Sequence, residues 1–249
     1  MRHEVFSLVR PRGHGPTGGR PDLRYLRYLP WGGAPPEGWP LIVFLHGAGE
    51  RGDDLELLLS QGLPKHVEQH EDFPFAILSP QCPAGSSWYR QTSALTTLLR
   101  HALAALPVDA RRVYLTGLSM GGYGTWHLAA RHPELFAAIA PICGGGLRSY
   151  GFPKKVRALR DLPVWCFHGA LDTVVPPEES QRLVDELRAH GGHVKLTLYP
   201  DVAHDSWTRT YANPALYEWL LSHRRPVAEE LRPPRGGARG GPARRGSRR

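Results

Sequence analysis

One turn constrains the fold of this 249-residue chain more than any other feature. Residues 113–130 form a β-branched and apolar run, then the string G-L-S-M-G at 117–121, then an amphipathic stretch with helical spacing. The pattern predicts a strand, a sharp turn and a helix, with Ser119 strained at the turn. A Cβ at either flanking glycine would collide with the neighbouring strand or helix. Such a turn lifts the hydroxyl above the sheet's carboxyl edge and aims the helix N-terminus at developing negative charge.

The string alone is weak, because a glycine-rich turn can also hold an ordinary N-capping serine. A catalytic interpretation needs a base, an acid and oxyanion donors elsewhere in the chain. Asp172 follows the apolar run 162–168, and His204 follows the alternating run 193–199. An acid there can hold a histidine in the tautomer that accepts the serine proton. The order serine, acid, histidine is that of α/β-hydrolases and differs from those of chymotrypsin and subtilisin.

Other residues compete for these roles. Asp201 and Asp205 lie near His204 in the sequence, but acids this close in sequence rarely reach back to Nδ1 of the same ring, so Asp172 is preferred. His46 and His168 lie in tight strand exits, and we interpret both as structural.

The oxyanion hole is expected to consist of two backbone amides. The apolar run 41–46 ends in the loop 46–54, and in α/β-hydrolases the corresponding loop donates one N–H while the residue after the nucleophile donates the other. Ala48 and Met120 are the candidates. Each such donor lowers the barrier by about 3 kcal/mol because it needs no reorganisation. The alternative is that His46 and Gly47 simply form a tight strand exit.

Candidate substrate contacts are aromatic. Trp88 and Tyr89 lie in the loop 80–89, where they could either line a pocket or anchor the loop by packing, and Trp207 lies close to His204. The insertion at 147–161 is too short for a large cap. The sequence therefore predicts an open cleft suited to small or exposed esters.

Strand-like and helix-like runs alternate, which predicts an α/β fold: a mostly parallel central sheet with helices on both faces and little or no cap. With 41% hydrophobic residues, one domain can bury a large core. We expect a loose lead-in at 1–22, the domain at 23–224 and a disordered tail rich in Arg, Gly and Pro at 225–249. Expected strands lie at 23–29 (an edge strand), 41–46, 75–79, 108–116, 136–143, 162–168 and 193–199. Expected helices lie at 55–70 (broken near 62–64), 92–106, 178–190 and 213–223.

The formal net charge of +8 suggests nucleic-acid binding until the charge is located. Residues 232–249 carry seven arginines and no acid, so the remaining residues have a net charge of +1. Arginine with glycine can bind RNA or another polyanion, although this segment has no aromatic residue for base stacking. We prefer a solvated extension without a selected partner.

Three cysteines at unrelated spacings indicate free thiols and a reducing compartment. The chain shows no signal-peptide core, no apolar span of membrane length, no H-E-x-x-H and no C-x-x-C. We therefore expect a cytoplasmic protein with a small-molecule substrate, no membrane association, no cofactor and no metal.

Several stretches resemble the predicted-peptidase and esterase group of the α/β-hydrolase superfamily. They are F-L-H-G-A-G-E-R-G-D-D, S-P-Q-C-P, Y-L-T-G-L-S-M-G-G-Y-G-T-W, C-G-G-G, F-H-G-A-L-D-T-V-V-P and A-H-D-S-W. The group is related to dienelactone hydrolases, to feruloyl esterases and polyhydroxybutyrate depolymerases, and to the phospholipase/carboxylesterase family. The resemblance covers residues 23–224 and implies metal-free carboxylic-ester hydrolysis with Ser119 as nucleophile, Asp172 as acid and His204 as base. Dienelactone hydrolases generally carry cysteine at the elbow, where this chain has Ser119.

Two related reactions remain as alternatives. Prolyl oligopeptidases use the same triad but add a propeller domain, for which this chain has no room, and an amine is harder to expel than an alcohol. A transferase would use an alcohol in place of water on the acyl-enzyme.

Overall fold

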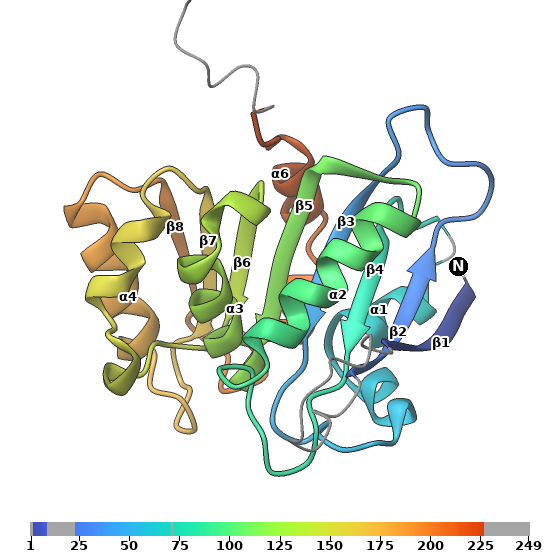
Figure 1. Ribbon diagram of the computed structural model, residues 1–249. Helices are drawn as coiled ribbons and strands as arrows, with labels where there is room; N and C mark the ends of the chain where they lie inside the picture. The colour runs from blue at the N-terminus through green and yellow to red at the C-terminus, as the bar shows by residue number, and fades with distance from the viewer. Residues whose placement is uncertain (1, 9–22, 71, 227–249) are drawn as a thin grey trace, which may run out of the picture.

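The computed structural model describes residues 2–8, 23–70 and 72–226, which contain an eight-stranded sheet in the order β1-β2-β4-β3-β5-β6-β7-β8 (Figure 1). Strands β3 to β8 run parallel to one another, while β2 pairs antiparallel with both β1 and β4. The strands are β1 Arg2–Leu8, β2 Leu23–Leu29, β3 Trp39–Leu45, β4 Ala76–Pro80, β5 Val108–Leu118, β6 Ala138–Ile142, β7 Val164–Gly169 and β8 Val194–Tyr199. The prediction of a mostly parallel α/β sheet is confirmed.

The first strand corrects the expected organisation. Residues Arg2–Leu8, predicted as part of a loose lead-in, pair with all of β2 from Arg2 opposite Leu29 to Leu8 opposite Leu23. The free edge of β2 offers a complete ladder of backbone partners, so β1 becomes the edge strand and β2 lies inside the sheet. The rest of the lead-in, 9–22, and the tail from 227 onward lie outside the described residues.

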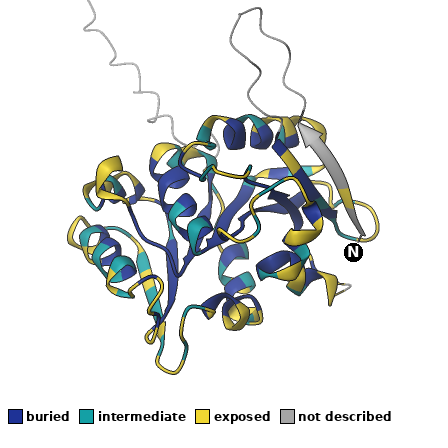
Figure 2. Cartoon of the chain, turned by 90° about the horizontal axis from the view of Figure 1, so that it is seen from below, coloured by how far each residue is buried: buried dark blue, intermediate teal, exposed yellow. Residues whose placement is uncertain are grey.

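Two helical layers cover the sheet, and the alternation of side chains along β3 shows how. Leu41, Val43 and Leu45 point into a core closed by α2 Thr92–Ala105, α3 Met120–Arg131 and α4 Glu178–Ala189. Ile42 and Phe44 point into the opposite core, closed by α1 Gly62–Glu68, α5 Ser206–Tyr211 and α6 Pro214–Leu221. All seven residues of β3 are buried, as expected for a parallel strand covered on both faces. The dark strands at the centre of Figure 2 show the same burial.

Short helical turns complete the chain. The helix predicted over 55–70 divides at its expected break into η1 Leu55–Ser60 and α1, with Gly62 at a φ of +64°. The insertion between β6 and β7 holds the turns η3 Arg148–Tyr150 and η4 Lys154–Leu159, and η2 Pro133–Leu135 precedes β6. The described insertion is thus too small to form a cap domain, as predicted.

Helix α5 was not predicted. Its N-cap Asp205 accepts a hydrogen bond from the Thr208 backbone N–H at 3.0 Å, so a local cap starts a six-residue helix where the sequence suggested only a loop. None of the helices in the described part of the chain combines the length and apolar character that a bilayer crossing requires.

Candidate active site

The turn between β5 and α3 has the predicted geometry. Ser119 adopts φ 52° and ψ −116°, a region that costs a non-glycine residue about 1–3 kcal/mol. A Cβ on Gly117 would lie 2.6 Å from Leu45 O, and one on Gly121 would lie 1.8 Å from the same atom. Both flanking positions therefore require glycine, and the predicted collision is confirmed. The close approach fixes α3 against the end of β3 and leaves Ser119 half-buried above the sheet edge.

The three predicted side chains lie together in one hydrogen-bonded chain. His204 Nε2 lies 3.0 Å from Ser119 Oγ, and His204 Nδ1 lies 2.7 Å from Asp172 Oδ2. They come from loops after β5, β7 and β8, whose carboxyl ends meet at one edge of the sheet. His204 keeps 21% of its side chain exposed, whereas the Asp172 side chain is 0% exposed. The ring thus reaches from a buried acid to a hydroxyl at the surface of the cleft.

Asp172 is held in its ionised form. Its Oδ1 accepts the backbone N–H groups of Val174 and Val175, both at 2.9 Å. Burial is the largest single influence and favours the neutral acid, but hydrogen bonds from His204, Val175 and Val174 together outweigh it. The pKa of Asp172 is therefore lower than its ordinary value.

The alternative acids are engaged elsewhere. Asp201 forms a two-pronged ion pair with Arg209, with both N–O distances at 2.8 Å. Asp205 caps α5 through the Thr208 backbone and hydroxyl. Neither is bonded to His204 among the hydrogen bonds of the described residues, which supports the preference for Asp172.

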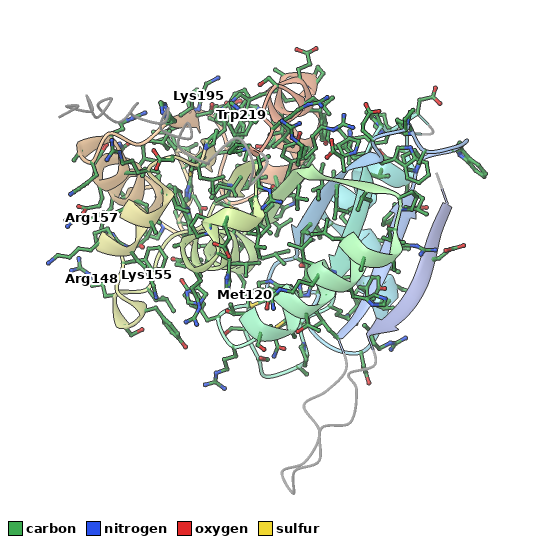
Figure 3. All side chains as sticks on the ribbon, turned by 45° about the horizontal axis from the view of Figure 1, so that its top comes forward. Met120, Arg148, Lys155, Arg157, Lys195 and Trp219 are labelled. Carbon is green, nitrogen blue, oxygen red and sulfur yellow. The ribbon has the colours of Figure 1, made fainter. Side chains whose placement is uncertain are left out.

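The loop after β3 lies against the elbow. A Cβ on Gly121 would be 2.8 Å from His46 O, and Met120, labelled in Figure 3, is the first residue of α3. The first N–H groups of a helix have no acceptor within the helix, so the Met120 amide is available at the site. Ala48 is exposed two residues after His46. The two candidate oxyanion donors therefore lie on adjoining segments beside Ser119.

His46 links this loop to the loop after β4. Its Nδ1 lies 2.5 Å from Gly47 O, while its Nε2 accepts the Cys82 backbone N–H at 2.9 Å. Nε2 is therefore the unprotonated nitrogen, and Nδ1–H donates to Gly47 O. Burial lowers the pKa of His46 to about 4, which keeps the ring neutral. Because Gly47 O and the Ala48 N–H belong to one peptide group, His46 fixes the plane of the candidate donor.

The three candidate aromatic residues take different places. Trp88 is only 1% exposed and donates its Nε1–H to His46 O at 2.9 Å, so it anchors the loop instead of lining a pocket. Tyr89 is also buried, and its hydroxyl accepts the Leu147 N–H at 3.3 Å. For both residues the packing alternative describes the structure. Trp207 packs edge-on against the His204 ring at 5.3 Å between centroids.

Sequence reasoning missed a contact of His168, which was interpreted as structural. This side chain is completely buried, and its Nε2 lies 3.1 Å from Asp172 Oδ2. The sequence did offer one signal. A histidine inside an otherwise apolar strand is expected to be buried, and a buried polar ring requires a hydrogen-bond partner. The pattern did not reveal that the partner is the candidate acid.

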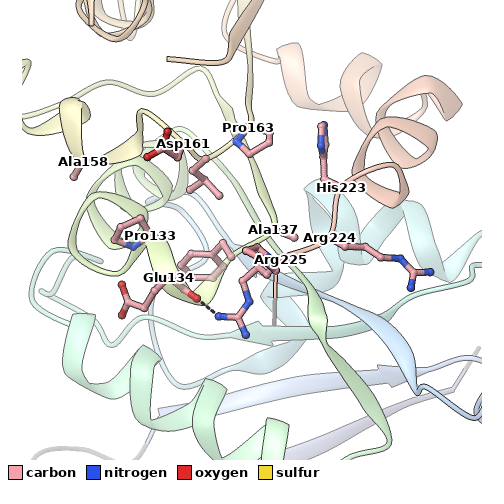
Figure 4. Close-up of a pocket in the computed structure, with 12 residues that line it drawn as sticks. Pro133, Glu134, Ala137, Ala158, Asp161, Pro163, His223, Arg224 and Arg225 are labelled. Carbon is pink, nitrogen blue, oxygen red and sulfur yellow. Dashed lines mark hydrogen bonds between the residues drawn. The ribbon is translucent and has the colours of Figure 1, made fainter. Parts of the chain in front are cut away.

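A separate cavity of about 600 Å³ lies away from this constellation (Figure 4). Its lining includes Ala137 and Pro163, which directly precede β6 and β7, so it opens at the amino ends of these strands. Arg225 lines it and donates to Glu134 O. Ser119 follows the carboxyl end of β5, and the cavity therefore plays no part in the candidate site.

The described residues contain no group of three His, Cys, Asp or Glu side chains arranged to hold a metal ion. Cys82, Cys143 and Cys166 are buried and free. Cys143 lies directly beneath the elbow, where its Sγ accepts the Ser119 N–H at 3.3 Å.

Comparisons with known proteins relate the chain to esterases and depolymerases. The solved structure of a thermostable esterase superposes with a TM-score of 0.73 and 36% identity, covering 90% of this chain and 63% of that one. Poly(3-hydroxyoctanoate) depolymerase of Pseudomonas fluorescens is 31% identical over 174 residues, 59% of this chain and 61% of the depolymerase. Poly(3-hydroxyalkanoate) depolymerase C of Paucimonas lemoignei is 25% identical over 239 residues, 80% of this chain and 55% of the depolymerase. The chain thus spans less than two thirds of the length of either depolymerase.

The family model for phospholipases and carboxylesterases matches residues 79–214, which is more than half of the chain. The match begins in β4 and includes the elbow, the Asp172 loop and His204. The chain belongs to the phospholipase/carboxylesterase family of α/β-hydrolases.

Proposed function

We propose that this protein is a serine esterase that cleaves carboxylic esters through an acyl-enzyme on Ser119. The observation that carries the proposal is the hydrogen-bonded chain Ser119–His204–Asp172 at distances of 3.0 and 2.7 Å. Family membership and the 36% identity with a solved esterase support ester hydrolysis.

In the proposed reaction, His204 Nε2 takes the Ser119 proton while Oγ attacks the ester carbonyl. Asp172 keeps the proton of the neutral ring on Nδ1, so that Nε2 is free to accept. The Ala48 and Met120 amides bind the oxyanion, and the imidazolium returns its proton to the departing alcohol. Water then repeats the sequence on the acyl-enzyme and releases the acid.

The substrate is proposed to be a small or exposed ester with an apolar acyl part. Ser119 is half-buried and its neighbouring insertion forms only short turns, so a chain-like ester can reach it. Loops at the same sheet edge expose the apolar residues Leu147, Leu171 and Val174. The relatives named as polyester depolymerases act on esters of this general kind.

The direct test is hydrolysis of p-nitrophenyl esters from acetate to decanoate by the wild type and Ser119→Ala in parallel. We expect ester cleavage that falls by at least about 10³-fold in the variant, since it removes the nucleophile. The chain-length optimum reports the depth of the acyl site. Undiminished hydrolysis by Ser119→Ala would refute the proposed nucleophile. Proline p-nitroanilides in the same panel test the peptidase alternative.

A further inference from the structure

The most telling unassigned group is His168, in β7 directly behind the candidate acid. Its ring is 0% exposed, and Nε2 faces two acceptors: Asp172 Oδ2 at 3.1 Å and Val175 O at 2.9 Å. A carbonyl oxygen cannot donate, so Nε2 carries the hydrogen. His168 therefore donates into the acid loop from the buried side.

The opposite side of the same ring is also fixed. Its Nδ1 lies 2.7 Å from the hydroxyl of Ser180, a residue of α4 that is itself 0% exposed. The Ser180 hydroxyl has one hydrogen and two acceptors within reach, His168 Nδ1 at 2.7 Å and Gly144 O at 3.0 Å. Burial lowers the pKa of His168 and favours a neutral ring, whose unprotonated Nδ1 is the nearer acceptor of that hydrogen bond. With a partner at each nitrogen, the ring can neither flip nor rotate without losing a hydrogen bond.

The two oxygens of Asp172 are consequently held differently. Oδ1 is fixed by two backbone amides of its own loop, whereas Oδ2 receives one histidine from the cleft and one from the core. The cleft-side partner, His204, is the one that changes charge in the proposed reaction. Among the hydrogen bonds of the described residues, the one from His168 is the contact that holds Oδ2 independently of that change.

We infer that His168 is a positioning residue of the esterase reaction: it orients the Asp172 carboxylate so that Oδ2 stays aimed at His204 Nδ1. The inference rests on the proposed function, since it assigns a task within that triad. It also differs from a purely structural role, in which His168 would only satisfy buried polar atoms and stabilise the fold. A structural role affects stability without acting through Asp172.

Two substitutions at this position separate the contributions. His168→Phe keeps a planar ring of similar size but removes the donor. His168→Gln places an amide nitrogen close to the former Nε2 and retains a donor toward Asp172. His101→Phe, on the exposed surface of α2, controls for the loss of a histidine. Each variant is assayed for kcat and KM on the best ester, for the rate at which a fluorophosphonate modifies Ser119, and for thermal unfolding.

We expect His168→Phe to lower kcat and the fluorophosphonate rate by roughly 10- to 100-fold, because small misplacements of catalytic groups are costly. KM should stay within about 3-fold, since no substrate contact is lost. His168→Gln should recover most of the rate, and His101→Phe should match the wild type. A His168→Phe enzyme with kcat within about 2-fold of the wild type would overturn the inference.

A double-mutant cycle with Asp172→Asn supplies the decisive comparison. If His168 acts through Asp172, adding His168→Phe to Asp172→Asn costs less than about 2-fold further in kcat. If His168→Phe lowers kcat as much in the Asp172→Asn background as in the wild type, His168 has a role independent of the acid, and the inference is overturned.

Ser180→Ala gives a second route if His168→Phe does not fold, because it removes the partner of His168 Nδ1 while keeping the ring. Ser180→Ala should lower kcat less than His168→Phe does, and it should not lower kcat further in the Asp172→Asn background. A further fall in kcat in that background overturns the inference.

The proposed function is judged separately in the same assays. A wild type that loses ester cleavage on Ser119→Ala, together with a fully active His168→Phe, overturns only the inference. Ester cleavage that survives Ser119→Ala overturns both.

Discussion

At the scale of single residues, the hydrogen bonds of Asp172 determine how a substitution of this residue changes catalysis. In Asp172→Asn the side-chain oxygen is preferred at the Oδ1 position, where it faces two backbone N–H donors, against the single fixed donor, His168 Nε2–H, at the Oδ2 position. The amide nitrogen then faces His204 and donates to Nδ1, forcing the ring into the tautomer whose Nε2–H cannot accept the serine proton. We expect kcat to fall by about 10⁴-fold with little change in KM. Steady-state kinetics on the best ester checks this, and a loss confined to KM would contradict it.

His46 should make the protein sensitive to acid. Its pKa is about 4 in the folded state against an ordinary value of 6.5, so between these values the unfolded chain binds the extra proton. Stability should therefore fall as the pH drops from 6.5 toward 4, with His46 contributing on the order of 3 kcal/mol. Urea unfolding at intervals of pH measures this slope.

His46→Asn is the matched variant, because its amide can still donate to Gly47 O but does not titrate. Its unfolding free energy should be lower at neutral pH, since Cys82 N–H loses its acceptor, and should depend less on pH between 6.5 and 4. An equal slope in both proteins would show that other groups govern the acid sensitivity. Asp172 acts at lower pH, because its lowered pKa means that its contribution is lost only as the pH falls through that value.

The proximity of Ser119, Asp172 and His204 was predictable, because their order and their places after strands are properties of the chain itself. It could not assign Trp88, because whether a loop aromatic faces the cleft or the core depends on packing between distant segments. The contact of His168 with Asp172 was missed for a related reason, because it depends on how the turn after β7 folds back, which spacing alone does not show.

At the scale of elements, the packing of α3 on β3 is the most sensitive contact. A methyl group at Gly121 would lie 1.8 Å from Leu45 O, and neither backbone can yield without moving the elbow. Gly121→Ala should destabilise the protein by more than about 4 kcal/mol or prevent folding. Gly33→Ala is the matched control, since nothing lies within 4 Å of its added Cβ. Thermal unfolding followed by circular dichroism compares the two, and similar stabilities would contradict the account.

The elements themselves were largely predictable, because β2 to β8 and most helices have strong periodicity. Strand β1 and helix α5 were not predicted. Strand β1 is defined by the ladder that β2 offers, and α5 depends on a cap at Asp205 within a segment too short to show helical spacing. Both are cases in which a partner or a single side chain decides the structure, rather than a repeated pattern.

At the scale of the whole molecule, we propose that catalysis resides in the α/β domain, β1 included, and that the basic tail acts separately. The seven arginines of 232–249 lie beyond the described residues. A protein ending at residue 231 should keep kcat/KM within about 2-fold, because a neutral ester gains little from distant charge. It should also elute from heparin at lower salt than the full chain. A large loss of ester hydrolysis on truncation would contradict this division.

The most direct test of the central claim is to trap the acyl-enzyme. The wild type and Ser119→Ala are mixed with p-nitrophenyl acetate, quenched in acid within the first turnover and analysed by mass spectrometry with peptide mapping. The account predicts one acetyl group on Ser119 of the wild type and no acetylated peptide in the variant at the same quench time. Acylation at another residue, or an ester cleaved without any acylated protein under single-turnover conditions, would contradict the proposed mechanism.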